Sequence, residues 1–446
     1  MTQDLTLAGR ALGPGLGRDA VERLSDLKQE PAWLRERRLA AWNLYEQMPT
    51  PTPRERAWKY TDITRLDFDQ FSPFAASSTA PDAESRLRGY VEDRETRAGL
   101  IVQHDSEASH AELQSELAAR GVIFCGLDEA VQKYPDLVRD NFMTTCIPAS
   151  TSKLAALHAA FWSGGVLVHV PRNVEITLPL YSAFWAQAAG LAAFPHVVIV
   201  AERNSRVTLV DEYASPSRQG IALSDAVAEI FVGDGAQVRY VNLQRWDTGT
   251  YHFSTQRALL GRDAVLRYVT VGLGARLSKV TNEAILEGAG SNSEMLGLFF
   301  GEKGQKFDAI TLQDHRGPRT TSDLLYKSAL RDRAQSIYYG LVRVGPEARG
   351  SDANQENRNL LLSDQAKADS DPVLEILTSE VVRCAHGATV GPVDEEQLFY
   401  LQCRGLPHNE AERLLVAGFF TGVIQRVPVV QVRTKLENAI LERLGE

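Results

Sequence analysis

The sequence predicts a mainly β protein whose centre is a parallel β-helix, with helical regions before and after it. Three observations predict this class. Short runs of alternating apolar and polar residues fill the middle of the chain, a small turn recurs between them, and apolar residues at both ends have helical spacing. With 446 residues, the chain is long enough to bury a core without disulfides or a structural metal.

Residues 1–150 are expected to form a mostly helical N-terminal region. Pro31 suits the first turn of a helix, where its missing N–H costs little. Leu34, Trp42 and Tyr45 then follow at roughly helical spacing, and the Pro-Thr-Pro segment 51–53 ends that helix. Short apolar runs further along this region are mixed with helical pieces.

Residues 151–391 are expected to form the parallel β-helix core. Val166, Val168 and Val170 fall on one face of a predicted strand, and Leu167 and His169 fall on the other. Similar period-two runs rich in Val, Ile and Tyr follow along the chain, which is the pattern of strands.

A small turn that ends in Ala or Ser recurs between these runs. Its second residues, at positions 205, 236, 264 and 291, are 31, 28 and 27 residues apart. A repeat of this size indicates a solenoid, because each coil buries its apolar face against the next. A β-sandwich is the competing interpretation, since its strands also recur between turns. The turn pairs are Asn204-Ser205, Gly235-Ala236, Asp263-Ala264 and Gly290-Ser291.

Residues 392–446 are expected to form a C-terminal helical domain. Asp394 and Gln397 have the spacing of a capping box, and Gly405 suits the end of the first helix. Leu398, Phe399, Tyr400 and Leu401 are expected to give that helix an apolar side. A second helix opens near Asn409 and a third at Pro428. Their predicted apolar stripes are Ala411, Leu414, Leu415 and Phe419 in the second, and Val429, Val432, Leu436, Ile440 and Leu444 in the third.

Charge and composition argue against several function classes. The net charge is −9 and no run of Lys and Arg marks a face for nucleic acid or an anionic membrane. No apolar run reaches the roughly 18 residues of a membrane span. We expect no signal peptide, because no basic region followed by an apolar stretch is seen in the first residues. The four cysteines form no C-x-x-C pair. We therefore expect a cytoplasmic protein with reduced thiols.

No phosphate-binding loop, dinucleotide fingerprint or hydrolase motif is present, and two polar clusters remain. Asp314 and His315 could form a tuned base or ligand, although a polar turn is the favoured interpretation. Cys384 and His386 would share one face of a strand, where they could bind a soft metal, form a Cys–His nucleophile or simply pack. Cys403 is expected to pack at a helix end.

The stretch from Cys384 to Gly405, CAHGATVGPVDEEQLFYLQCRG, resembles the signature of the SufB/SufD family of iron–sulfur cluster assembly scaffolds. Four more segments are similar to the same family: SDLLYK at 322–327, NRNLLLS at 357–363, PVLEI at 372–376, and WKYTD at 58–62. The resemblance is close over residues 310–425 and looser over residues 54–446.

This resemblance implies a right-handed parallel β-helix and a scaffold that is not itself an enzyme. It also implies two partners: a SufB-like paralogue, and a SufC-like ABC ATPase that docks on the C-terminal domain, where Leu415 and Phe419 are candidate contacts. Iron or a nascent iron–sulfur cluster would be held transiently and shared with SufB. No tightly bound cofactor is expected.

Two positions favour the SufD branch. Leu401 stands where SufB carries a cysteine thought to receive the cluster, and His386 matches a SufD histidine implicated at the SufB interface. His386 is therefore the leading candidate for iron or cluster assembly, with Cys384 a weaker one. Two other hypotheses stay open: a metal-dependent or Cys–His enzyme on a β-helix, and a SufB-type scaffold that forms homodimers.

Overall fold

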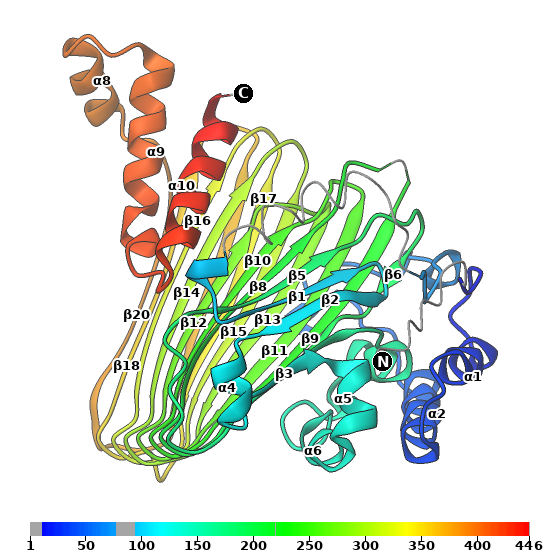
Figure 1. Ribbon diagram of the computed structural model, residues 1–446. Coiled ribbons are helices and arrows are strands. Elements are labelled where there is room, and N and C mark those ends of the chain that lie inside the picture. Colours follow the sequence, from blue (N-terminus) through cyan, green and yellow to red (C-terminus); the bar gives the residue numbers. More distant parts are fainter. Residues whose placement is uncertain (1–10, 77–93, 219, 446) are drawn as a thin grey trace.

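The predicted parallel β-helix is confirmed. The computed structural model describes residues 11–76, 94–218 and 220–445, and its strands form a solenoid of about eight turns with helices at both ends of the chain (Figure 1). Because the neighbouring strands of the solenoid run parallel and the two sheets are joined coil by coil, the β-sandwich interpretation is wrong.

Two ten-stranded sheets form the walls, and only the pairs β1–β2 and β3–β4 are antiparallel among the strands described. Sheet A has the order β2 (Glu107–Leu113), β1 (Gly99–His104), β5 (Leu180–Trp185), β8 (Arg206–Ala214), β10 (Gln237–Arg245), β12 (Val265–Gly272), β14 (Asn292–Gly301), β16 (Thr321–Leu330), β18 (Ser351–Leu361), β20 (Val381–Pro392). Sheet B has the order β19 (Lys367–Ile376), β17 (Gln335–Val344), β15 (Lys306–His315), β13 (Leu277–Leu286), β11 (Thr250–Leu260), β9 (Ala222–Val232), β7 (His196–Ala201), β4 (Gly165–Val170), β3 (Ile123–Gly126), with β6 (Ala192–Ala193) beside β9.

The core between the two sheets is formed by the side chains on one face of each strand. Val166, Val168 and Val170 point into it, as the alternation predicted, together with inward residues of every later coil down to Tyr338. Leu167 lies on the opposite face, where it packs against the N-terminal helices. Strands covered on both faces are nearly continuous runs of apolar residues, which is the case for β7 after His196.

The recurring turn holds one residue per coil in the left-handed conformation. These residues are Asn173, Asn204, Gly235, Asp263, Gly290, Arg319 and Gly350, with φ between 53° and 73°. Each donates its backbone N–H to a carbonyl of the following coil, at 2.5–3.0 Å. The second residue of each predicted turn pair is buried, which explains the Ala and Ser found there. Asn, Asp and Gly suit this column because they tolerate positive φ best.

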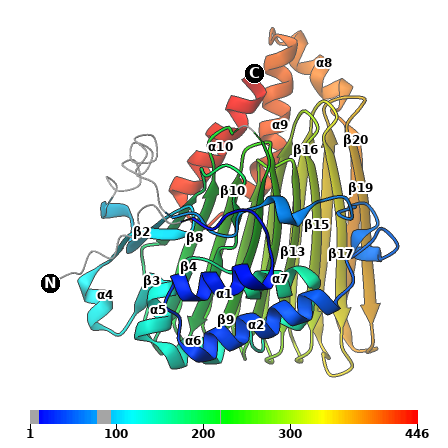
Figure 2. The same ribbon diagram turned by 90° about the vertical axis from the view of Figure 1, so that its right-hand side faces the viewer.

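The N-terminal helices cover the outer face of sheet B, as Figure 2 shows for α1 and α2. Beside these helices, the first 150 residues contribute strands β1–β3 to the solenoid. The α-helices described before β4 are α1 (Arg18–Leu27), α2 (Ala32–Gln47), α4 (Ser115–Ala119), α5 (Leu127–Lys133), α6 (Pro135–Asn141) and α7 (Lys153–Phe161). Pro31 is the N-cap of α2, and Leu34 and Trp42 are buried.

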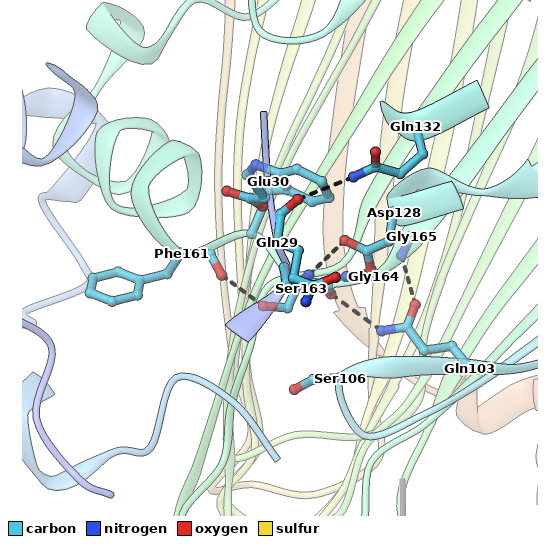
Figure 3. A network of polar contacts seen from close by, with 12 residues as sticks. Gln29, Glu30, Gln103, Ser106, Asp128, Gln132, Phe161, Ser163, Gly164 and Gly165 are labelled. Carbon is cyan, nitrogen blue, oxygen red and sulfur yellow. Dashed lines mark hydrogen bonds and ion pairs between the residues drawn. The ribbon is translucent and has the colours of Figure 1, made fainter. Parts of the chain in front are cut away.

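Polar side chains fix the entry into the first coil. Figure 3 shows Gln103 and Asp128 pointing at consecutive glycines, and they accept hydrogen bonds from the backbone N–H groups of Gly165 (2.7 Å) and Gly164 (3.2 Å). A Cβ on Gly165 would lie 1.9 Å from the carbonyl oxygen of His196. The chain therefore needs glycine where it turns into β4.

A buried chain of three titratable side chains joins α7 to sheet B. His158 Nε2 lies 2.9 Å from His196 Nδ1, and His196 Nε2 lies 3.0 Å from Glu229 Oε2. Glu229 also accepts hydrogen bonds from the backbone N–H groups of Met143 and Ile147, at 2.6 and 2.9 Å. Burial raises the pKa of Glu229 to about 8 and lowers the pKa of His196 to about 3.

The Trp58–Asp62 segment crosses the outer face of sheet B as a strap. Lys279 on β13 lies 4.7 Å from the Trp58 ring centroid and donates hydrogen bonds to the carbonyl of Ala57 (2.6 Å) and to Asp308 (2.8 Å). The Thr61 hydroxyl donates to the same carboxylate. The tryptophan and threonine of this motif therefore enclose a buried ion pair.

The C-terminal helices α8 (Glu395–Cys403), α9 (His408–Ile424) and α10 (Val430–Gly445) follow the last strand. Asp394 caps α8 by accepting hydrogen bonds from the N–H groups of Glu396 and Gln397, and Gly405 has φ +91° after the helix, as predicted. Helices α9 and α10 lie on the outer face of sheet A, whereas α8 stands clear of the strands (Figure 1). The stripe of α10 is confirmed.

Of the four residues in the predicted apolar stripe of α9, only Ala411 is fully buried, although Phe419 also packs against the cluster on sheet A. The buried residues of α9 are Ala411, Val416, Phe420, Val423 and Ile424. Leu414 is 54% exposed, while Leu415 and Phe419 are half-buried at the edge of the contact. The helix contains more apolar residues than one face can hold, so spacing alone selected the wrong set.

Candidate functional site

The last coil of the solenoid is uncovered. β19 and β20 each end their sheet, so one edge of each strand has no strand beside it in the described chain. Burial changes abruptly here, because β18 has alternating buried residues and β20 has none. Apolar side chains are exposed on this coil, among them Val382 (71%), Leu377 and Val390. Open strand edges with exposed apolar residues are typical of surfaces that pair with another chain.

Strand β20 places His386 and Cys384 on this open end. The register pairs His386 with Gln355 and Cys384 with Ala353, and both of those β18 residues are fully buried. His386 and Cys384 therefore lie on the inward face of β20, as the period-two pattern predicted. Because no further coil covers them, His386 is exposed and Cys384 is only partly buried, against the cluster that contains Ala353.

A hydrogen-bonded polar layer lies directly beneath His386. Gln355 donates to the Tyr338 hydroxyl at 2.9 Å, and that hydroxyl also lies 2.9 Å from Thr311 Oγ1. Burial raises the pKa of Tyr338 well above its usual value, so the phenol stays neutral. The interior of the solenoid is therefore polar and uncharged just below the exposed imidazole.

Cys384 is a weaker candidate than His386 in this geometry. Burial, and secondarily the Asp352 carboxylate, raises the pKa of the Cys384 thiol, so less of it is the thiolate that binds iron or attacks an electrophile. Within the described part of the chain no hydrogen bond joins Cys384 to His386, and no group of three or more His, Cys, Asp or Glu is placed to hold a metal ion. The two residues supply at most two ligands.

Asp314 and His315 are the last two residues of strand β15 and are buried there, whereas the favoured interpretation placed them in a polar turn. His315 is fully buried, and its ring nitrogens lie 2.7 Å from the hydroxyls of Thr320 and Ser322. Burial lowers the pKa of His315 to about 4, so it is neutral at physiological pH. Asp314 pairs with Arg316 at 2.8 Å. These contacts account for both residues without a ligand.

The C-terminal helices expose apolar residues that the sequence pattern assigned to a buried side. Phe399 (67%), Tyr400 (57%) and Leu414 (54%) are exposed on α8 and α9. Leu415 and Phe419 are less accessible, and Lys327 lies 4.8 Å from the Phe419 ring centroid and donates to its carbonyl. The sequence signal for this exposed surface was the Phe-Tyr dipeptide at 399–400. The helix that carries it, α8, has no buried residue.

The other cysteines are placed differently. Cys125 and Cys146 are buried, and burial raises the pKa of Cys125 to about 12. Cys403 is exposed at the end of α8, so the expectation that it packs was wrong. None of the described helices is long and apolar enough to cross a membrane.

Comparison with known proteins covers nearly the whole chain. Residues 184–419 match the family described as SUF system FeS cluster assembly, SufBD core domain, and residues 22–181 match the SufBD protein N-terminal region. Iron–sulfur cluster assembly SufBD family proteins of Staphylococcus epidermidis and Staphylococcus haemolyticus are each 31% identical over 427 residues. One from Staphylococcus aureus is 30% identical over the same length. The aligned part is 93% of this chain and 90% of each relative. The chain belongs to the SufBD family of iron–sulfur cluster assembly proteins.

Proposed function

We propose that this chain is the SufD-type scaffold subunit of a cytoplasmic iron–sulfur cluster assembly complex, without turnover of its own. The observation that carries the proposal is His386, an exposed imidazole on the inward face of a last coil that nothing in the described chain covers. In this role a SufB-like paralogue covers the open coil, and iron or a nascent cluster passes between the two subunits as cargo.

The number of ligands supports a shared site. Neutral imidazole binds iron through one nitrogen, but His386 and Cys384 together leave most of a coordination sphere unfilled. The partner subunit would therefore supply the remaining ligands. Leu401, in the position of the SufB cysteine, has no donor atom, which favours the SufD type over a homodimer of SufB type.

The exposed aromatic surface of the C-terminal helices supports an ATPase partner. Phe399 and Tyr400 present apolar area on α8, which stands clear of the strands (Figure 1), and Leu414 adds to it on the exposed side of α9. Exposed apolar clusters of this kind mark protein contacts. In our proposal a SufC-like ATPase docks there, with Leu415 and Phe419 at the margin rather than at the centre.

Co-purification from cells that co-express the candidate partners tests this function. A tagged chain should capture a SufB-like paralogue and a SufC-like ATPase, and the isolated chain should hydrolyse no ATP. Val390→Glu on β20 should lower capture of the paralogue but not of the ATPase, because the charge lies on the open coil. Val430→Glu, on an exposed valine at the start of α10, is the matched control for the paralogue. Equal capture of the paralogue by both variants would remove the open coil from the interface.

A further inference from the structure

A cavity of about 400 Å³ lies on the outer face of sheet A, beneath the connection between α9 and α10. Strands β10, β12 and β14 form its floor, and Arg426 forms a wall. This volume is in the range of small-molecule sites. The cavity is separate from the open coil, since β16 and β18 lie between β14 and β20 in the sheet.

Two rows of side chains line the floor in strict register. Gln237, Val265 and Asn292 are neighbours on successive coils and form the first row. Arg239, Arg267 and Glu294 form the second row, two residues further along the same strands. Coils are spaced about 5 Å apart, so the first row places an apolar side chain between two carboxamides about 10 Å apart.

The charges around this cavity do not balance. Glu294 pairs with both Arg267 and Arg426, and Asp323 pairs with Arg426. Three arginines therefore face two carboxylates, and the surplus positive charge lies on Arg239. Throughout the described residues, no carboxylate lies within ion-pair distance of its guanidinium.

Arg239 is also held beside other cations. It is in register with Arg267, and like charges directly opposite each other in a sheet are destabilising. Burial, together with Arg267 and Arg206, lowers the pKa of the Arg239 guanidinium. A bound anion would relieve this repulsion. In contrast, Arg206 on β8 has its own partner, Glu175, at 2.6 Å.

Two neutral donors complete the site. The side-chain carboxamides of Gln237 and Asn292 line the cavity and make no hydrogen bond with any other described residue. Val265, which is 37% exposed, lies between them and offers apolar contact. One guanidinium without an ion-pair partner, two carboxamides without a hydrogen bond and the apolar side chain of Val265 together match an organic anion with one charged end.

We propose that this cavity binds a small organic anion, whose carboxylate or phosphate group pairs with Arg239 while its apolar body lies over Val265. Guanidinium binds both groups through two parallel N–H donors, so the two chemistries share one mode of recognition. This site is independent of the proposed function, since it uses neither His386 nor the exposed residues of α8.

Titration calorimetry on the full chain tests the site with three probes: benzoate, phenyl phosphate and neutral benzyl alcohol. We expect one or both anions to bind more tightly than the alcohol, and to bind more weakly as salt rises. The tighter anion identifies the head group. Arg239→Gln should weaken binding by roughly tenfold or more, because it removes the charge-assisted pair. Arg239→Lys should retain part of the affinity through its point charge.

Arg333→Gln is the matched control, since Arg333 is an exposed turn arginine whose side chain forms no hydrogen bond or ion pair with the part of the chain that the structure describes. Circular dichroism melting confirms that each variant is folded. Any of three results would overturn the proposal. Arg239→Gln could bind the anions as tightly as the unaltered chain does, the unaltered chain could bind benzyl alcohol as tightly as the anions, or neither anion could bind at millimolar concentration. Loss of paralogue or ATPase capture in Arg239→Gln, with anion binding unchanged, would assign the cavity to a protein contact instead.

Discussion

The buried Glu229–His196–His158 chain leads to a specific prediction about pH and stability. His158 Nδ1 lies 2.8 Å from the carbonyl oxygen of Asp225, which can only accept, so this nitrogen carries a proton. Burial lowers the pKa of His158 well below its usual value, so its other nitrogen is an acceptor. His196 must then donate through Nδ1 and accept at Nε2, and only a protonated Glu229 can supply that hydrogen bond.

The structure therefore holds a proton that the unfolded chain releases. The pKa of Glu229 rises from 4.5 to about 8 on folding. A raised carboxyl pKa means that stability is highest at low pH and falls as the pH rises from 4.5 toward 8, by about 1.4 kcal/mol per pH unit. The lowered pKa of His196 acts in the opposite direction, but only below pH 6.5. Between pH 6.5 and 8, Glu229 should lower the free energy of unfolding by about 2 kcal/mol.

The measurement is urea unfolding at pH 6.5, 7.25 and 8.0, followed by circular dichroism, for the unaltered chain and Glu229→Gln. Glutamine resembles the protonated carboxyl but does not titrate. The stability of Glu229→Gln should therefore fall less steeply with pH than that of the unaltered chain, with a slope smaller by about 1.4 kcal/mol per pH unit. Its absolute stability is expected to be lower, since the amide nitrogen leaves the Met143 N–H without an acceptor. Glu46→Gln, at an exposed position of α2, is the control. Parallel pH dependence of Glu229→Gln and the unaltered chain would refute the assignment of the proton.

Three further predictions concern partners and packing. His386→Ala should leave folding and partner binding intact while maturation of a reporter iron–sulfur enzyme falls roughly tenfold or more, and Cys384→Ser should have the smaller effect. Normal maturation by His386→Ala would remove this residue from the mechanism. Phe399→Glu combined with Leu414→Glu should weaken ATPase binding by about 2 kcal/mol or more in calorimetry, without a change in melting temperature. An unchanged affinity would place the ATPase elsewhere. Phe420→Ala should destabilise the chain by about 3–5 kcal/mol, because this ring is buried between α9 and sheet A. A loss below 1 kcal/mol in urea unfolding would show that the helix does not pack as described.

The sequence predicted those features that depend on local physical constraints. The turns were recognisable because positive φ restricts the first residue to Asn, Asp or Gly in most coils, and burial restricts the next to a small side chain. The strand faces of β4 followed from strict alternation. The cap at Asp394 and the end at Gly405 followed from hydrogen-bonding chemistry that acts over three residues.

Features set by distant parts of the chain were not predictable in this way. Helix α9 is apolar on more than one side. The side that packs is decided by its contact with sheet A, whose residues Leu325 and Leu296 lie more than 80 residues earlier in the chain. The cavity at Arg239 draws on three coils and on Arg426, so no sequence motif records it. His386 was recognised through its family signature, but only the strand register showed that it lies over Gln355 on an uncovered coil.

The column of left-handed turns has a consequence for how this scaffold can change length. Each coil begins at an equivalent residue, such as Asn204 or Gly235, and its turn hydrogen-bonds to the turn of the next coil. A duplication from one such residue to the next would therefore add a complete rung and leave both ladders in register. Each added rung would move His386 about 5 Å further from the first coil of the solenoid, at β4. The number of coils therefore sets the distance between the first coil and the open last coil.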